Sequence, residues 1–166
     1  MSSIEVLNNH DVIGLDMDDT LMYGYRSHIL QDWILKNYPL KELWVVTFRT
    51  GVYVNTVFDE LKGVGLKSHM FKGIKSVPSQ LYFKHKEAAN AYIIKNQNLK
   101  KYYRFLEYKN YTEKDLEKNY NDYLEWKGLA CKEIGATILL DDLPDKVLPG
   151  CYKYNIDFIN SLQLQW

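Results

Sequence analysis

Three aspartates, Asp16, Asp18 and Asp19, lie close together directly after an apolar run, in the segment VIGLDMDDTLMYG of residues 12–24. Carboxylates crowded at the end of a buried strand repel one another, and a divalent cation between them would offset that repulsion. Hard oxygen ligands suit Mg²⁺, which commonly takes one or two carboxylates together with phosphate oxygens of a substrate. The segment therefore predicts a Mg²⁺ site that binds a phosphate ester.

Residues at the ends of two other apolar runs supply partners for these aspartates. Thr47 ends the run LWVVT of residues 43–47, and Asp141 ends the run ATILLD of residues 136–141, directly before Asp142. Because parallel sheets bind ligands at the carboxyl ends of their strands, these side chains can converge in one crevice. A threonine hydroxyl and a lysine there would hold phosphate, while one aspartate attacks phosphorus and a second transfers protons.

Two other kinds of acidic site do not fit this spacing. An EF-hand that begins at Asp16 needs Gly at its sixth position and Glu at its twelfth, where this chain has Leu21 and Ser27. A phospho-accepting receiver domain has its acidic pair after the first strand and its acceptor aspartate after a later one, which reverses the order found here. Both alternatives are therefore excluded.

The elements that must position these residues follow from the periodicity of apolar side chains. Four short apolar runs are typical of buried parallel strands and lie at residues 11–16, 43–47, 80–83 and 136–141. Helical periodicity predicts a helix over residues 27–38 with Ser27 as its N-cap, and a second over residues 51–63 with Gly63 as its C-cap. This alternation predicts an α/β fold, a three-layer Rossmann-like parallel sheet flanked by helices.

Residues 87–126 differ from the rest in being rich in Lys, Asn and Tyr. Thr112, followed three positions later by Asp115, is typical of a capping box at the start of a helix. Tyrosines and lysines in such a segment can stack on bases or bind phosphates, but the packing of a helical hairpin is the favoured interpretation. We therefore expect residues 1–166 to form a single catalytic domain that carries residues 87–126 as a helical insert or minimal cap.

Composition narrows the classes of function. The 166 residues include 21 Lys and Arg and 21 Asp and Glu, so no overall basic field directs the chain to nucleic acid, although a nucleic-acid partner stays open. No apolar run approaches the ~18 residues of a membrane span, which favours a cytoplasmic protein without a membrane partner. Cys131 and Cys151 lack metal or redox spacing and are expected as reduced core residues. The four histidines also lack metal-ligand spacing and are expected at the surface or at helix ends.

Four segments in order resemble the motifs of the haloacid dehalogenase (HAD) superfamily. GLDMDDTL resembles motif I, DxDx(T/V), and LWVVTFRTG is similar to motif II, an apolar strand that ends in Thr or Ser. ATILLDDLPDKV resembles motif IV, an apolar strand that ends in an acidic pair. KGLACKEIGATILLDD is similar to the run of lysine, helix, glycine, strand and paired aspartates found near the end of many members. The resemblance identifies a phosphatase-type member with a minimal cap.

The resemblance implies that Asp16 is the nucleophile, which would form an aspartyl-phosphate, and that Asp18 is the general acid/base. An aspartate at position 18 favours a phosphatase over other activities of the superfamily. Thr47 would hydrogen-bond the phosphoryl group. Contacts that bind substrate or orient the motif I loop are implied for three further residues, Thr20, Phe48 and Arg49, although a surface cation explains the arginine equally well.

The Mg²⁺ ligands that the resemblance implies are four aspartates: Asp16, Asp18 through its carbonyl, Asp141 and Asp142, of which Asp141 is either a ligand or a partner of the ligands. The lysine of motif III is ambiguous. Lys127 has the family-like distance to the acidic pair, whereas Lys84 and Lys86 follow the third apolar run. Lys127 is favoured because it lies on an otherwise apolar helical stripe, where a lysine needs an anionic partner.

These observations predict a Mg²⁺-dependent phosphatase that hydrolyses a phosphomonoester, whether a small phosphate ester, a nucleotide or a phosphoprotein. The short interval between Thr20 and Thr47 leaves no room for a large cap after motif I, and whether residues 87–126 act as a lid or as a homodimer surface stays open. The alternative is a non-catalytic phosphate-sensing or interaction module that keeps the metal site. Asp18 argues against that alternative, because a pure binder needs no acid/base.

Overall fold

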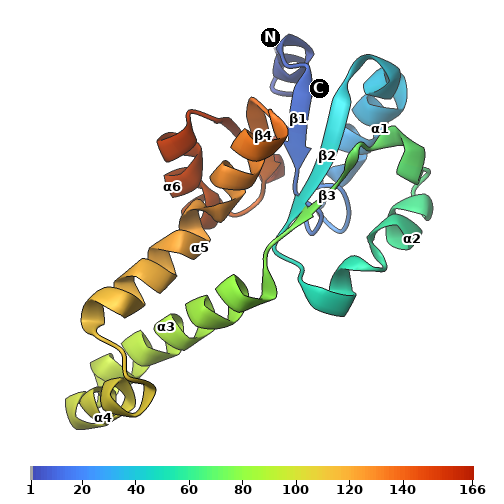
Figure 1. Ribbon diagram of the computed structural model, residues 1–166. Helices are drawn as coiled ribbons and strands as arrows, with labels where there is room; N and C mark the ends of the chain where they lie inside the picture. The colour runs from blue at the N-terminus through green and yellow to red at the C-terminus, as the bar shows by residue number, and fades with distance from the viewer. Residues whose placement is uncertain (1) are drawn as a thin grey trace.

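A computed structural model describes residues 2–166 and contains a five-stranded parallel sheet (Figure 1). The strands are β1 (Val12–Leu15), β2 (Glu42–Thr47), β3 (Gly73–Ser76), β4 (Ile138–Asp141) and β5 (Asp157–Asn160). Their spatial order is β3-β2-β1-β4-β5, and every neighbouring pair is parallel, so β1 lies at the centre of the sheet. The predicted Rossmann-like α/β fold is confirmed.

Helices cover both faces of this sheet, with α1 and α2 on one side and α5 and α6 on the other (Figure 1). The helices are α1 (Ser27–Asn37), α2 (Val57–Lys62), α3 (Ser79–Gln97), α4 (Leu99–Lys109), α5 (Glu113–Ile134) and α6 (Pro144–Tyr154). Short 3₁₀ turns are η1 (Ile4–Asn9), η2 (Tyr38–Leu40), η3 (Gly51–Val54), η4 (Ser68–Met70) and η5 (Ser161–Gln163). Over residues 2–166, no helix combines the length and the apolar character that a membrane crossing requires.

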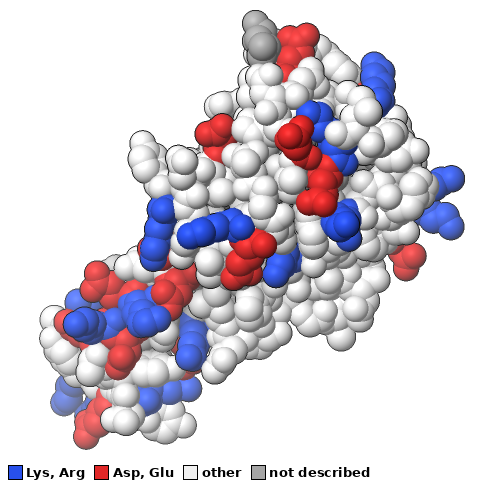
Figure 2. All heavy atoms as spheres, turned by 45° about the horizontal axis from the view of Figure 1, so that its top comes forward, with Lys and Arg blue, Asp and Glu red and all other residues white. Residues whose placement is uncertain are grey.

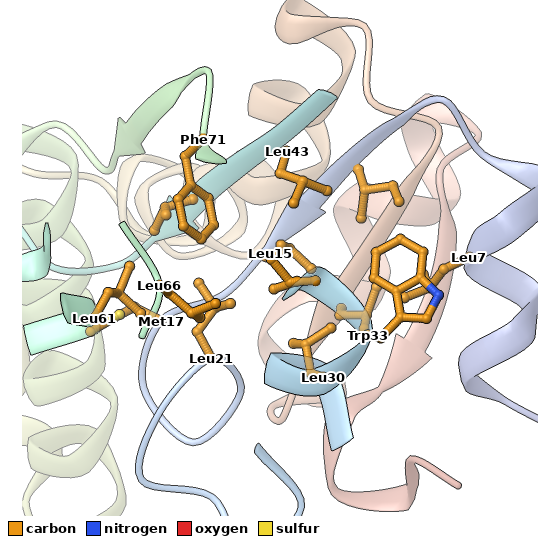
Figure 3. Close-up of a cluster of buried hydrophobic side chains, with 14 of the residues drawn as sticks. Leu7, Leu15, Met17, Leu21, Leu30, Trp33, Leu43, Leu61, Leu66 and Phe71 are labelled. Carbon is orange, nitrogen blue, oxygen red and sulfur yellow. The ribbon is translucent and has the colours of Figure 1, made fainter. Parts of the chain in front are cut away.

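Alternate residues of the strands pack into two separate cores, as the period of two in a strand requires. Leu15 and Leu43 point to the face covered by α1 and α2, where Figure 3 shows them among other buried leucines. Val46 and Leu139 point to the opposite face and pack with α5 and α6. The sheet is therefore buried on both sides, which is why β1, β2 and β4 are recognisable as continuous apolar runs.

Glycines allow α5 to lie unusually close to its neighbours. A Cβ atom added at Gly14 of β1 would lie 2.9 Å from the Sγ atom of Cys131 on α5. A Cβ added at Gly128 of α5 would overlap the backbone of Gly150 on α6. Lys127 is the residue directly before Gly128, so the close packing of α5 on α6 also fixes the position of the Lys127 side chain. Cys131 and Cys151 are buried and form no disulfide, as predicted.

The predicted third strand at residues 80–83 is wrong. These residues belong to α3, and the third strand is Gly73–Ser76. Leu81 and Tyr82 are apolar because they pack from α3 against the core on the α5 side of the sheet. A short apolar run on one helix face and a buried strand look alike in sequence, which explains the error.

The two predicted helices are present with changed boundaries. The helix over residues 27–38 is confirmed as α1, but Ser27 is its first residue rather than its N-cap, and the Ser27 hydroxyl accepts a hydrogen bond from the Gly24 N–H at 3.0 Å. The helix over residues 51–63 divides into η3 and the short α2, which ends before Gly63 as predicted.

An arm formed by α3, α4 and the first half of α5 extends away from the sheet (Figure 1). The arm has its own small core of Ala88, Ala91, Tyr102, Leu106 and Leu116. The helical conformation expected for residues 87–126 is confirmed, as is the capping box of Thr112 and Asp115, but both ends of that range fall inside continuous helices. Figure 2 shows basic and acidic side chains interspersed over the arm. Because α5 runs unbroken from the arm to the sheet, the insert and the site share one rigid element.

Candidate functional site

The predicted site residues meet at the carboxyl edge of the sheet. β1 and β4 are neighbours in the sheet, and the chain continues from them to helices on opposite faces. Parallel α/β sheets bind ligands at the crevice between two such strands. Asp16 directly follows β1, Asp141 ends β4, and Thr47 ends β2. Asp16 extends the pairing of the two central strands, since its N–H donates to the Leu140 carbonyl at 2.9 Å. The edge opens into a pocket of about 800 Å³, which Asp16, Asp18, Thr47, Lys127 and Asp142 line together.

Asp16, Asp141 and Asp142 form a compact carboxylate group. Each contributes an oxygen, and these three oxygens lie within 4.8 Å of one another. Burial raises the pKa of Asp16 well above its ordinary value; the positive charge of Lys127 opposes this effect and the negative charge of Asp141 adds to it. Burial also raises the pKa of Asp142. A divalent cation would relieve the same desolvation and repulsion, and carboxylate oxygens are the donors that suit Mg²⁺.

Lys127 lies inside this carboxylate group. Its Nζ donates to Asp16 Oδ1 at 2.7 Å and to Asp141 Oδ2 at 2.5 Å. The lysine side chain is completely buried, with Nζ 4.5 Å from the centre of the Phe48 ring. Burial lowers the pKa of Lys127, but the two carboxylates raise it more, so the group stays a cation at neutral pH. The anionic partners that the sequence required for this lysine are thus Asp16 and Asp141.

The other two lysines considered for motif III lie farther from the nucleophile position. Lys86 is exposed and lines the outer part of the pocket, where its Nζ lies 5.2 Å from the centre of the Tyr82 ring. Lys84 lines a different groove, between α3 and the start of α5. Of the three candidates, Lys127 is the one that contacts Asp16.

Asp141 and Asp142 occupy different positions although they are adjacent in sequence. Both oxygens of Asp141 have partners, because Oδ2 accepts from Lys127 and Oδ1 accepts from the Leu143 N–H at 2.8 Å. Asp141 is fully buried, whereas Asp142 is half-buried and faces the pocket. This arrangement favours Asp142 as the direct metal ligand and Asp141 as the group that holds Lys127.

The loop after β1 alternates between the core and the pocket. Met17 and Leu21 are buried with the leucines of the α1–α2 side, where Figure 3 shows both, and they anchor the loop. Asp16 and Asp18, on either side of Met17, line the pocket instead. Asp19 has a φ of 61°, in the left-handed region that aspartate tolerates better than most residues. The DxD spacing therefore places two carboxylates on one side of an anchored turn, and Asp19 forms the turn itself.

Thr20 connects this loop to β5. Its Oγ1 donates to Asp16 Oδ2 at 3.3 Å and shares a 2.8 Å hydrogen bond with the Ser161 hydroxyl. Both side chains are buried. Sequence reasoning missed Ser161, and a prediction of β5 would have revealed it as another polar residue directly after a strand. Thr20 and Ser161 together orient the second oxygen of Asp16.

Arg49 lies in the pocket rather than on the open surface, with 16% of its side chain exposed. It forms a two-point ion pair with Asp18, from Nε to Oδ2 at 2.9 Å and from Nη2 to Oδ1 at 2.7 Å. Its Nη1 donates to Glu60 of α2 at 2.5 Å. The hydrogen bond from Arg49 is the main reason that the pKa of Glu60 falls to about 2. Arg49 thus fixes Asp18 against α2, and Glu60, which carries no recognisable motif, was not predicted.

Thr47 and Phe48 connect the end of β2 to the pocket and to the arm. Thr47 is buried, and its hydroxyl accepts a hydrogen bond from the Arg49 N–H at 3.0 Å. Phe48 stacks on Tyr123 of α5 at a centroid distance of 4.4 Å. His85 stacks on Tyr123 at 3.9 Å and is itself buried, so the expectation of a surface or helix-end histidine is wrong here. The physical reason is that α3 packs against α5, and burial accordingly lowers the pKa of His85.

Comparisons with protein-family models, curated proteins and solved structures find no match for this chain.

Proposed function

We propose that the chain is a Mg²⁺-dependent phosphatase of the haloacid dehalogenase type, which hydrolyses a phosphomonoester through an aspartyl-phosphate on Asp16. The observation that carries this proposal is the contact of the Lys127 Nζ with both Asp16 and Asp141. This contact lies at the floor of a pocket that Asp18, Thr47 and Asp142 also line. A nucleophile candidate, an acid/base candidate and oxygen ligands for a metal thus surround one space.

The carboxylate oxygens of Asp16 and Asp142 would hold Mg²⁺, and Asp18, on the same loop as Asp16, also lines the pocket. When bound, the ion supplies positive charge that neutralises the phosphoryl oxygens and screens the attacking carboxylate. Asp141 supports this set indirectly, since both of its oxygens are held by hydrogen bonds within the protein.

In the first half of the reaction, a carboxylate oxygen of Asp16 attacks phosphorus and the ester P–O bond breaks. Lys127 and Thr20 hold the two carboxylate oxygens of Asp16, which restricts the rotation of the nucleophile. Thr47, which is buried at the end of β2 and lines the pocket, would donate to the phosphoryl group. Asp18 gives a proton to the leaving alkoxide, so the alcohol departs as a neutral product.

In the second half, Asp18 accepts a proton from water, and the water oxygen attacks phosphorus of the aspartyl-phosphate. The bond between Asp16 and phosphorus breaks, inorganic phosphate leaves, and the Asp16 carboxylate is regenerated. Arg49 holds both oxygens of Asp18 in a two-point ion pair, and Glu60 holds Arg49 in turn, so one of the two hydrogen bonds to Asp18 has to open when Asp18 carries the proton. Arg49 is a positioning residue in this scheme, because its donors are directed at carboxylates.

Removal of Mg²⁺ is expected to lower the hydrolysis of para-nitrophenyl phosphate by more than about 100-fold, because such an ion contributes several kcal/mol to charge stabilisation. The measurement is phosphate release by the purified protein after treatment with a chelator and again after addition of Mg²⁺. Circular dichroism should not change on chelation, since Lys127 already stabilises Asp16 and Asp141 in the fold. Binding of inorganic phosphate with Mg²⁺ but without hydrolysis of any ester would contradict the enzyme and favour the phosphate-sensing module.

A further inference from the structure

Two large aromatic side chains stand at the rim of the pocket and remain exposed to solvent. Tyr53 of η3 has 70% of its surface exposed, and Phe83 of α3 has 59%. They come from elements that follow different strands, β2 and β3, and both line the same pocket as Asp16. Together they give this pocket an exposed aromatic surface that a ligand bound at Asp16 can cover.

Two other aromatic rings that line the pocket, those of Phe48 and Tyr82, already have partners on their faces. Tyr123 covers Phe48 at a centroid distance of 4.4 Å, and the Lys127 Nζ lies 4.5 Å from the centre of the same ring. The Lys86 Nζ lies over Tyr82 at 5.2 Å. The ring faces left open to a planar ligand are therefore those of Tyr53 and of Phe83, which meets Tyr82 only in an edge contact at a centroid distance of 5.5 Å.

Three polar side chains of the pocket wall, those of Arg49, Thr50 and Thr56, are paired within the protein. The Thr50 hydroxyl shares a 2.7 Å hydrogen bond with Ser79, and the Thr56 hydroxyl donates to Glu60 at 2.8 Å. Arg49 directs its donors to Asp18 and Glu60. A planar ring can therefore cover this part of the wall without displacing these hydrogen bonds.

The pocket is larger than a phosphoryl group alone requires. A volume of about 800 Å³ lies within the usual range for whole organic ligands, so the phosphoryl group fills only the floor. In an aryl phosphate the ring is attached directly to the phosphate, so a phosphate at Asp16 keeps the ring close to Asp16 as well. A ring that reaches Tyr53 and Phe83 needs a spacer between it and the phosphate, and a ribose supplies one.

We propose that the substrate of this site is a nucleoside monophosphate, whose phosphate lies at Asp16 and whose base stacks on Phe83 and Tyr53. This inference rests on the proposed phosphatase function. Base stacking on aromatic side chains is sequence-tolerant, so purine and pyrimidine nucleotides should both be accepted.

The first test compares kcat/KM for AMP, ribose-5-phosphate and para-nitrophenyl phosphate in the presence of Mg²⁺. AMP should exceed ribose-5-phosphate by roughly 10-fold or more, because the two esters differ only by the stacking base. Equal values for these two esters would overturn the inference while leaving the phosphatase intact. A lack of hydrolysis of all three esters would overturn the proposed function instead.

The second test uses Phe83→Leu and Tyr53→Leu, which remove the ring and keep an apolar side chain. Each should raise KM for AMP by about 10-fold with kcat unchanged, and neither should affect ribose-5-phosphate. Tyr152→Leu is the matched control, since Tyr152 is 88% exposed on α6 and lies outside this pocket. Unchanged KM for AMP in both rim variants, or an equal change for both esters, would contradict base stacking.

A binding measurement separates the inference from catalysis. Calorimetric titration of the Asp16→Asn protein with AMP, in the presence of Mg²⁺, should give a roughly 10-fold weaker affinity when Phe83→Leu is added. The same pair of proteins should bind ribose-5-phosphate equally. If Phe83→Leu lowers the affinity for AMP and for ribose-5-phosphate by the same factor, or lowers neither, the base does not stack on this ring.

Discussion

Asp16→Asn is expected to lower kcat for any phosphate ester by about 10³-fold or more, because an amide cannot take the place of the attacking carboxylate. The variant should fold normally. Burial already disfavours the charged form of Asp16 by raising its pKa, so a neutral side chain of the same shape removes an electrostatic penalty. The measurement is steady-state phosphate release together with thermal unfolding of the same protein.

Asp59→Asn is the matched control for this change. Asp59 is an exposed residue in the first turn of α2, outside the pocket, so the same change of chemistry there should leave kcat unaltered. Full activity of Asp16→Asn, or an equal loss in Asp59→Asn, would contradict the assignment of Asp16 as the nucleophile.

Lys127→Met is expected to lower the free energy of unfolding by about 3–5 kcal/mol, the usual range when one partner of a buried ion pair is removed. The methionine can fill the space, but Asp16 and Asp141 would then face each other in the interior without a cation. Urea denaturation at neutral pH measures the change. Lys153→Met is the control, because Lys153 pairs with Glu125 at 2.8 Å while 53% of its side chain is exposed, and such surface pairs contribute less than about 1 kcal/mol.

The loss in Lys127→Met should become smaller at acidic pH. A carboxylate whose pKa is raised by folding destabilises the native state when it is ionised, so protonation of Asp16 as the pH falls restores stability. Addition of Asp141→Asn should recover part of the stability at neutral pH in the same way. If Lys127→Met is as stable as Lys153→Met, the buried ion pairs do not hold the site together.

The central part of the fold was predictable because its signals are strong. β1, β2 and β4 are buried on both faces, so each appears as a continuous apolar run that ends in a polar residue. Polar residues at the ends of parallel strands must converge, which brought Asp16, Thr47 and Asp141 together before the structure was known. Lys127 was recognisable because a lone lysine on an apolar helical stripe requires buried anions.

The edge strands of the sheet and the residues of the pocket wall were harder to predict, because their sequence patterns are weaker. β3 and β5 are edge strands with few buried side chains, and their sequences GIKS and DFIN show little apolar character. Glu60 and Ser161 enter the site only because α2 and the end of β5 pack beside the β1 loop, which is a tertiary relation. Tyr53 and Phe83 look like ordinary surface aromatics until the pocket between them is formed.

The aspartyl-phosphate on Asp16 is the central claim, and trapping that intermediate tests it most directly. The protein is mixed with AMP or para-nitrophenyl phosphate and Mg²⁺, quenched with acid during turnover and reduced with borohydride, which converts an aspartyl-phosphate to homoserine. Peptide mapping by mass spectrometry should find homoserine at position 16, only when both the ester and Mg²⁺ are present. Steady turnover with an unmodified Asp16, or homoserine at Asp18 instead, would contradict the account.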